Sequence, residues 1–321
     1  MSERVVAITG ASGFVGRNVC EALAHAGWHV RAIVRLTGSA PTSASEVHAG
    51  VDLDGPVDWS QTCAGADVVV HCAGVAHTTF ANETLARSTF ERVNRVASGE
   101  LARAAAAAEV GRFVFVSSIG VYGNLGADAM AAESMKCQPV EPYASSKYAA
   151  ERDLEDIFRD TATELVVVRP PLVYGQLCPG NFARLVKLVR SGLPLPLGSI
   201  RGRRHFVSVD NLADFIVAAC SHEGDARGTF NVADAEEIDL KDILRAIGEG
   251  TGRRVRLVYF PLPWLRSLLR VVGREATLDK LDESILVDAS RAREHFGWTP
   301  RISTSDGMRA AAASFRRGVE P

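Results

Sequence analysis

Tyr143 and Lys147 stand four residues apart in the segment Tyr143-Ala-Ser-Ser-Lys147. On a helix, this spacing places both side chains on one face. A phenol with its ordinary pKa of about 10 is a poor base at neutral pH. A neighbouring ammonium lowers the pKa of the phenol because it favours the phenolate. The pair is therefore suited to general acid–base chemistry, although the same spacing also occurs by chance on solvent-facing helix turns.

Ser118 directly follows the apolar segment 112–117, which we predict to be a strand. A hydroxyl at a strand end can hydrogen-bond the reacting oxygen of a substrate and orient it toward the tyrosine. Ser117 is the neighbouring alternative. We expect Ser118, Tyr143 and Lys147 to be catalytic, and we expect Ser118 and Tyr143 also to contact the substrate.

A second feature with chemical meaning is a glycine-rich turn near the N-terminus. Gly10, Gly13 and Gly16 lie between a predicted strand and a predicted helix. Glycine permits a tight turn and lets backbone N–H groups approach a pyrophosphate, which the positive end of the helix also attracts. This context predicts a dinucleotide site. The expected contacts are Gly10, Ser12, Gly13, Phe14, Val15 and Gly16.

The spacing of these glycines, TGxxGxxG led by Thr9, departs from the GxGxxG of ordinary dehydrogenases. It resembles the extended short-chain dehydrogenase/reductase family, which includes nucleotide-sugar epimerases, dehydratases and reductases. Further segments over nearly the whole chain share the resemblance, among them 168–175 and 287–300. The resemblance implies that Ser118 rather than Ser117 faces the substrate, and that Lys147 also holds the nicotinamide ribose.

The identity of the dinucleotide depends on the end of the second predicted strand. Arg35 stands there, and no Asp or Glu follows until Glu46. An acidic residue at this place usually binds the ribose hydroxyls of NAD, whereas a guanidinium can pair with the 2′-phosphate of NADP. The alternative is that Arg35 lies over the adenine. The sequence leaves both NAD and NADP open and slightly favours NADP.

The resemblance implies further cofactor contacts near the ends of other strands. Asp52 is expected at the adenine amino group, with a surface-loop carboxylate as the alternative. Asn94 is expected to brace the central strands, with an ordinary polar helix residue as the alternative. The complete set of these implied contacts is Asp52, Leu53, Cys72, Ala73, Gly74, Asn94, Ser117, Tyr143, Lys147 and Pro170.

On the substrate side, the segment 203–210 resembles the family pattern R-x-F-V-H-V-D-D, with Ser208 in place of the histidine and Asn211 in place of the second aspartate. The resemblance implies that Arg204 pairs with the diphosphate of a nucleotide sugar. It also places Asn181 near that diphosphate, with a helix N-cap as the alternative. Ile119 and Gly120 stand where family dehydratases carry Asp and Glu, so elimination of water is not expected.

The elements that must position these residues alternate along the chain. Apolar strand patterns separated by helical patterns predict βαβ units and a parallel sheet. The predicted strands are 5–8, 30–34, 67–71, 112–117 and 165–169, and the predicted helices are 18–26, 96–109 and 143–160. The predicted fold is α/β, a Rossmann-type doubly wound parallel sheet with a smaller mixed C-terminal substrate lobe.

Prolines and glycines become frequent after Pro170, which suggests a change of domain. We expect residues 1–170 to form the dinucleotide-binding domain. Residues 203–235, with a strand-like 206–209 and a helix 211–221, are expected to return to it. Residues 171–202 and 236–321 are expected to form the substrate-binding lobe.

Composition narrows the classes of partner. The formal net charge of −2 gives no reason to expect nucleic acid, and no apolar run is long enough to cross a membrane, so no membrane partner is expected. Six scattered cysteines without a CxxC pair argue against a metal site and a disulfide framework. With no signal peptide at the start, a cytoplasmic protein is expected.

These features leave several functions open. The first is an epimerase acting at carbon 4 of a UDP-hexose or UDP-N-acetylhexosamine through a transient 4-keto intermediate. The second is an NADPH-dependent reductase of a UDP-4-keto-6-deoxy amino sugar in polysaccharide biosynthesis. A reductase of a small carbonyl or phenolic substrate and a non-catalytic NADP-binding protein are further alternatives; the presence of both Tyr143 and Lys147 argues against the latter. The resemblance also implies a homodimer formed through helices 96–109 and 143–160.

Overall fold

The computed structural model describes residues 3–76, 82–126, 129–178, 180–271, 278 and 281–315. Seven parallel strands form the main sheet in the order β11-β7-β5-β4-β1-β2-β3. The strand order reverses direction between β1 and β4, which is the doubly wound arrangement. The strands are β1 (Val5–Thr9), β2 (His29–Ile33), β3 (Glu46–His48), β4 (Val68–His71), β5 (Arg112–Val116), β7 (Glu164–Arg169) and β11 (Gly228–Asn231).

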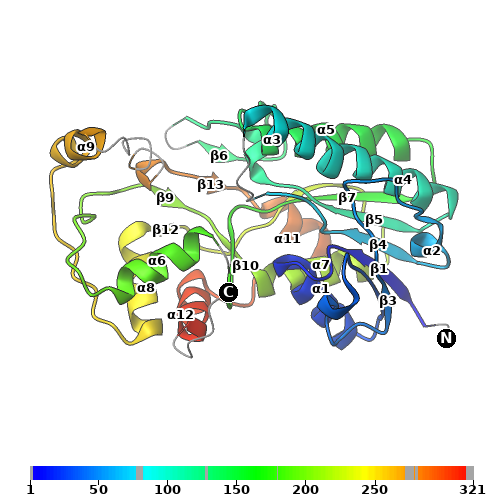
Figure 1. Cartoon of the computed structure of the whole chain (residues 1–321), viewed down its shortest axis with the longest axis horizontal. Helices are drawn as coiled ribbons and strands as arrows, with labels where there is room; N and C mark the ends of the chain where they lie inside the picture. The colour runs from blue at the N-terminus through cyan, green and yellow to red at the C-terminus, as the bar shows by residue number, and fades with distance from the viewer. Residues whose placement is uncertain are drawn as a thin grey trace.

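Helices cover both faces of this sheet (Figure 1). Helices α1 (Phe14–His25) and α7 (Val209–Ser221) pack on one face, and α4 (Ala97–Ala107) and α5 (Pro142–Phe158) pack on the other. Because neighbouring strand residues point to opposite faces, Val70 of β4 joins the core under α1 and α7, whereas Val69 joins the core under α4 and α5. Burial on both faces explains why the central strands are apolar along their length.

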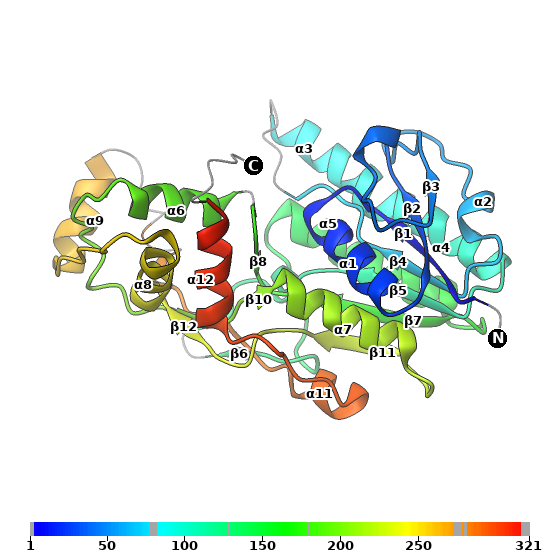
Figure 2. The same ribbon diagram turned by 90° about the horizontal axis from the view of Figure 1, so that it is seen from below.

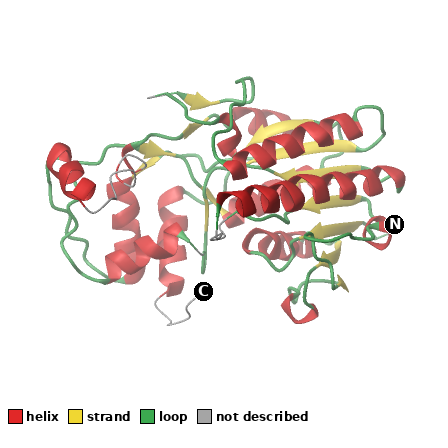
Figure 3. Cartoon of the chain, turned by 45° about the horizontal axis from the view of Figure 1, so that its top comes forward, coloured by secondary structure: helices red, strands yellow, loops and turns green. Residues whose placement is uncertain are grey.

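A second hydrophobic core lies beside the sheet domain (Figure 2, Figure 3). Three helices contribute most of it: α6 (Asn181–Arg190), α8 (Leu240–Thr251) and α12 (Thr304–Ser314). Short strand pairs join the two parts: β6 (Met130–Ala131) with β13 (Leu286–Val287), β8 (Val173–Tyr174) with β10 (Val207–Ser208), and β9 (Arg203–Arg204) with β12 (Ile238–Asp239). The remaining helices are η1 (Thr37–Ser39), α2 (Ser60–Cys63), α3 (Glu83–Phe90), η2 (Glu91–Val96), η3 (Ile119–Tyr122), α9 (Leu262–Val271) and α11 (Ser290–Phe296). The predicted fold class is confirmed.

Some element boundaries differ from those predicted. The first helix begins at Phe14, directly after the glycine turn, rather than at residue 18. The helix predicted from residue 96 is preceded by α3 and by η2, a π-helix, so that helical structure runs without a break from Glu83 to Ala107. The strand predicted at 206–209 is the two-residue β10, which pairs with β8 outside the main sheet.

Candidate active site

The glycine turn packs directly against the turn that follows β4. Gly10 has a φ of +68°, and a Cβ on it would lie 2.7 Å from the backbone of Ala73. A Cβ on Gly16 would lie 2.2 Å from the carbonyl oxygen of Gly10. These two glycines are therefore required by close backbone contact, and the structure brings Gly10 and Ala73 together as the sequence predicts.

The N-terminus of α1 is open. Its N-cap residue is Gly13, no side chain caps it, and its first turn carries no acidic residue. The amides of Phe14, Val15 and Gly16 have no partner within the helix because they belong to its first turn. Such donors at the positive end of a helix suit a pyrophosphate. The glycine turn and the N-terminus of α1, called the cradle below, therefore fit the dinucleotide that the sequence suggests.

The adenosine side of this cradle is less enclosed. Arg35 lies just beyond β2 with an exposed side chain, and its guanidinium has no ion-pair partner among the described residues. The carboxylate of Asp52 accepts a hydrogen bond from the amide of Asp54 at 3.2 Å, while Leu53 packs on the core under α4 and α5. The cofactor contacts expected of these residues stay predictions.

Asn94 joins the loop after β4 to the helix that carries the tyrosine. Its Oδ1 accepts from the amide of Val75 at 2.8 Å, and its Nδ2 donates to the carbonyl of Val75 at 3.0 Å and to Ser146 Oγ at 3.1 Å. A Cβ on Gly74 would lie 3.0 Å from Asn94 Oδ1 and 3.4 Å from Lys147 Nζ. Asn94 thus braces the loop after β4 against α5, whereas the bracing of the central strands expected of it stays a prediction.

The sequence did not suggest a role for the buried His71 at the end of β4. Its Nδ1 lies 2.6 Å from Thr9 Oγ1, and its Nε2 lies 2.8 Å from Ser98 Oγ. Because Ser98 donates its own proton to the carbonyl of Asn94, Nε2 must donate and Nδ1 must accept. Burial, with the nearby charge of Lys147, lowers the pKa of His71 to about 3. The imidazole is therefore neutral and fixed in one tautomer.

The three predicted catalytic residues lie on two elements, Ser118 after β5 and both Tyr143 and Lys147 on α5. Lys147 is 4% exposed, and its Nζ donates to the carbonyl of Val116 at 2.9 Å. The strand continues from Val116 to Ser118, whose half-buried Oγ accepts from the amide of Gly120 at 3.1 Å. Tyr143 lies one turn before Lys147 on α5, and its ring packs edge-on against Phe90 at 6.0 Å. The Lys147–Val116 bond thus ties the helix to the strand that presents Ser118.

Burial controls the pKa values of this pair. It raises the pKa of the Tyr143 phenol to about 12 and lowers that of the Lys147 ammonium to about 8. Desolvation is the cause of the Tyr143 shift, and the Lys147 ammonium is directed at the Val116 carbonyl. The expected lowering of the phenol pKa by this ammonium, together with the positive charge of an oxidised nicotinamide, stays a prediction. At neutral pH this arrangement holds a protonated phenol and a mostly charged lysine.

A buried ion pair lies one turn further along α5. Glu151 accepts from Arg169 at 2.5 Å and 3.1 Å, and it also accepts a short hydrogen bond from the Ser117 hydroxyl. Arg169 donates to Tyr122 Oη at 2.9 Å, and Tyr122 donates to Asn231 at 2.8 Å. The network links α5 to the ends of β5, β7 and β11. Since the Ser117 hydroxyl donates its proton inside the protein, it could take part in the predicted cofactor contact only as an acceptor.

Pro170 follows β7 and is buried at the same edge of the sheet. Its carbonyl accepts from the amide of Ile119 at 3.0 Å, so it supports the turn that begins after Ser118. Cys72 is half-buried and packs on the core under α1 and α7. The cofactor contacts expected of Pro170 and Cys72 stay predictions.

Arg204 lies at the boundary of the second core. Its guanidinium donates to the carbonyls of Glu283 at 2.8 Å and Leu281 at 3.3 Å. Burial lowers the pKa of Arg204, and the charge of Glu283 opposes this shift. Asn181 is exposed and is the first residue of α6, whose N-cap is Gly180, so the N-cap alternative for Asn181 is wrong.

The two departures from the family pattern near residue 208 have structural explanations. Ser208 caps α7 by accepting from the amide of Asn211 at 3.0 Å. Asn211 donates to the buried carboxylate of Asp234 at 2.7 Å and accepts from the amides of Arg301 and Ile302. An ionised aspartate at position 211 could accept but not donate, and would face Asp234 as a like charge.

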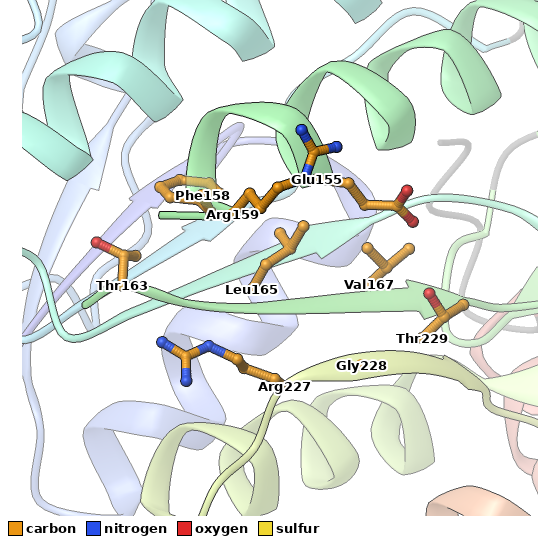
Figure 4. Close-up of a pocket in the computed structure, with 9 residues that line it drawn as sticks. All are labelled: Glu155, Phe158, Arg159, Thr163, Leu165, Val167, Arg227, Gly228 and Thr229. Atoms are coloured by element: carbon orange, nitrogen blue, oxygen red, sulfur yellow. The ribbon is translucent and has the colours of Figure 1, made fainter. Parts of the chain in front are cut away.

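A cavity of about 200 Å³ lies away from these residues, over β7 and β11 (Figure 4). Leu165 and Val167 form its floor, and Arg159 and Arg227 lie on opposite sides of it. Its lining includes none of the predicted site residues. Among the described residues, no group of three or more metal-ligating side chains could hold a metal ion, and no helix has the length and apolar character needed to cross a membrane.

The chain is similar to known proteins over most of its length. The model of the NAD dependent epimerase/dehydratase family matches residues 6–233. The chain is 30% identical to a UDP-glucose 4-epimerase of Vibrio cholerae over 97% of this chain and 95% of that protein. It is also 30% identical to a ceramide reductase of Caulobacter vibrioides over 92% of this chain and 86% of that protein.

Among solved structures, a UDP-glucuronic acid 4-epimerase from Bacillus cereus in complex with NAD has a similar fold. The TM-score is 0.78 over 98% of this chain and 99% of the other, at 21% sequence identity. At that level of identity the likeness concerns the fold.

Proposed function

The chain belongs to the NAD dependent epimerase/dehydratase family, within the extended short-chain dehydrogenases/reductases, and we propose that it is a 4-epimerase of a UDP-hexose or UDP-N-acetylhexosamine. It is an enzyme of the nicotinamide-dependent epimerase/oxidoreductase type. The observation that carries the proposal is the bond from Lys147 to the carbonyl of Val116, which ties the helix that carries Tyr143 to the strand that leads to Ser118. The relative from Vibrio cholerae supports a UDP-sugar as the substrate class.

In the proposed reaction, Ser118 holds the oxygen on carbon 4 of the sugar by a hydrogen bond. Tyr143 must first lose its own proton to solvent, which the positive charge of an oxidised nicotinamide would favour. Its phenolate then takes the proton of that hydroxyl as the C–O bond becomes a carbonyl, and it returns the proton when the alcohol re-forms on the opposite face. When bound, the nicotinamide cofactor accepts and gives back the hydrogen of carbon 4 with its electron pair. Lys147 stabilises the phenolate by its charge and holds the cofactor ribose.

The residues around Ser118 limit this reaction to one carbon. Ile119 and Gly120 follow it in η3, and neither side chain can transfer a proton. Elimination of water needs an acid and a base beside the departing hydroxyl. The proposed chemistry therefore ends with the transient ketone at carbon 4 and its return to an alcohol.

A net 4-keto reductase that uses NADPH is the second candidate. The exposed Arg35 beyond β2 favours it because a guanidinium there can pair with a 2′-phosphate. The ceramide reductase of Caulobacter vibrioides, as similar in sequence as the epimerase, shows that reduction occurs among the relatives. The two candidates share the same catalytic residues.

Two measurements separate these candidates. Mass spectrometry of the purified protein should find tightly held NAD if the enzyme is an epimerase, because such an enzyme regenerates its cofactor in every cycle. Incubation with UDP-glucose or UDP-N-acetylglucosamine should then give the 4-epimer by chromatography without added cofactor. Stoichiometric consumption of NADPH without epimer formation would instead identify a reductase.

The Arg35 contact has its own test. Arg35→Ala should weaken the binding of NADP far more than that of NAD, measured by calorimetry on the same preparation. Equal weakening of both dinucleotides would remove the proposed phosphate contact.

We propose that Arg204 and Asn181 contact the diphosphate of the nucleotide sugar. Arg204→Ala should raise the KM for the nucleotide sugar with little change in kcat. Arg203→Ala is a suitable control because Arg203 is the adjacent residue of β9 and pairs with Glu237 at the surface. An unchanged KM in Arg204→Ala would exclude the contact.

A further inference from the structure

The segment that runs from the end of α8 into the first turn of α9 exposes aromatic and basic side chains that the proposed reaction does not use. Tyr259 and Trp264 are each 72% exposed, and Val258 is 45% exposed. Arg254 and Arg256 are exposed in the same segment. These five residues are called the outer face below. The adjoining α9 lies at the end of the molecule opposite the seven-stranded sheet (Figure 1, Figure 2).

Backbone pairing holds the first part of this segment in an extended form. Leu257 forms a parallel bridge with Leu195, and the amide of Val258 donates to the carbonyl of Leu195 at 2.8 Å. Successive residues of an extended segment point to opposite sides. Val255 and Leu257 pack against the second core, so Arg254, Arg256 and Val258 point away from it.

The residues next to the exposed rings are packed against the second core. Phe260 and Leu262 pack on the second core, Leu265 is buried, and the Ser199 hydroxyl donates to the carbonyl of Phe260 at 2.6 Å. The neighbours of Tyr259 and Trp264 are thus fixed, while the two rings face solvent. Large exposed aromatic residues gathered in one place are typical of an interaction surface.

The charge of this region differs from that of the whole chain. Residues 250–271 contain five arginines and no acidic residue, although the chain carries a formal net charge of −2. Arg253, Arg254 and Arg256 have no acidic partner among the described residues. By contrast, Arg245 and Arg309 of the neighbouring helices pair with Asp242 and Glu249. The outer face therefore combines arginines that have no acidic partner among the described residues with two exposed aromatic residues within eleven positions of the chain.

We propose that the outer face docks the protein on the surface of an anionic lipid bilayer. Tryptophan and tyrosine favour the head-group level of a membrane, and arginines are attracted to anionic head groups. A second copy of this chain is a poorer occupant, because a symmetric contact would set these arginines against one another. Docking of this kind needs no segment that crosses the bilayer, and it revises the expectation of no membrane partner.

The native tryptophans provide a direct probe of this proposal. Trp28, Trp59 and Trp298 are 4–5% exposed, so Trp264 is the tryptophan most accessible to solvent. Vesicles of phosphatidylglycerol and phosphatidylcholine should shift the emission of the full-length protein to shorter wavelength and protect it from acrylamide. Vesicles of phosphatidylcholine alone should leave both unchanged. The shift should be absent in Trp264→Ser.

Cosedimentation with the same vesicles completes the test. Arg254→Gln combined with Arg256→Gln should weaken binding to anionic vesicles by about tenfold or more. Arg245→Gln combined with Arg309→Gln, which removes two paired arginines from the same lobe, should not. Binding should also weaken as salt is raised. Epimerase activity on a water-soluble substrate should be the same in all these variants.

Three results would overturn the proposal. The first is no sedimentation with anionic vesicles. The second is equal binding by the wild type and the outer-face variants. The third is concentration-dependent self-association that the outer-face substitutions abolish, which would make a second copy of the chain the occupant.

Discussion

Tyr143 carries the phenol on which the proposed proton transfer depends. Replacing it in Tyr143→Phe keeps the ring against Phe90 but removes the hydroxyl. Turnover should fall by about 100-fold or more, the usual contribution of general acid–base catalysis, while the melting temperature should change little. The matched control is Tyr148→Phe on the same helix, which should keep wild-type turnover. Near-normal turnover in Tyr143→Phe would remove this phenol from the mechanism.

The activity of the enzyme should fall at alkaline pH because Lys147 loses its charge. Burial lowers the pKa of its ammonium from 10.5 to about 8, so the charge that supports the phenolate is lost as pH rises through about 8. The pH profile of kcat/KM should therefore fall with an apparent pKa near 8. In Lys147→Arg the residual activity should lack this limb, because a guanidinium stays charged. The same limb in Lys147→Arg would assign it to another group.

The same pKa shift has a consequence for stability. Below pH 8 the lysine is charged in both the folded and the unfolded state, and its burial costs free energy. Between about pH 8 and 10.5 the unfolded chain binds more protons than the folded chain, so this lysine makes the protein more stable as pH rises through that window. Over this pH range the lysine therefore raises the stability of the fold, while the loss of its charge lowers kcat/KM.

At the scale of elements, the Glu151–Arg169 pair fixes α5 against the ends of β5 and β7. Glu151→Gln leaves the buried guanidinium of Arg169 without its counter-ion. Removing one partner of a buried pair costs about 3–5 kcal/mol, so the free energy of unfolding should fall by about that amount in urea titrations. Glu155→Gln, at an exposed pair with Arg152 one turn later, should cost less than about 1 kcal/mol. Equal losses in the two variants would contradict the structural role of Glu151.

The sequence predicts the elements whose signals are local. The glycine turn and the apolar strands β1, β4 and β5 are recognisable because burial on both faces demands apolar residues without interruption. β3 was missed because it is three residues long and carries Glu46 and His48. The continuation of α3 through η2 into α4 was also missed, although Asn82 caps the start of α3 by accepting from the amide of Leu85.

The residues of the candidate site also divide into those that a local motif predicts and those that depend on distant parts of the chain. Ser118, Tyr143, Lys147, Gly10 and Gly16 follow from motifs, but Glu151 and His71 depend on partners far away in the sequence. Glu151 stands four residues after Lys147, and a buried acid on the inner face of that helix was the signal that could have found it. The raised pKa of Tyr143 could not be predicted, because burial depends on the packed tertiary structure.

At the scale of the whole molecule, the two hydrophobic cores support the proposed division into a dinucleotide domain and a substrate lobe. β11, which lies within the returning segment 203–235, joins the main sheet beside β7. The core formed by α6, α8 and α12 is built from residues on both sides of that segment. We propose that the substrate binds between the two cores, near Arg204.

The proposed homodimer is also a property of the whole molecule. The helices expected to form its interface, α4 and α5, lie together on one face of the sheet, and Val96 at the start of α4 is 45% exposed. Light scattering after gel filtration should give twice the mass of one chain. Val96→Arg should shift the protein toward the monomer, whereas Val47→Arg at the edge strand β3 should not. A monomer in the wild type would contradict the proposal.

The buried imidazole at the end of β4 affects how the enzyme responds to a fall in pH. His71 stays uncharged down to about pH 3 because its ring is buried and lies near the charge of Lys147, between the hydroxyls of Thr9 and Ser98. Mild acidification of the medium therefore adds no second cation beside Lys147.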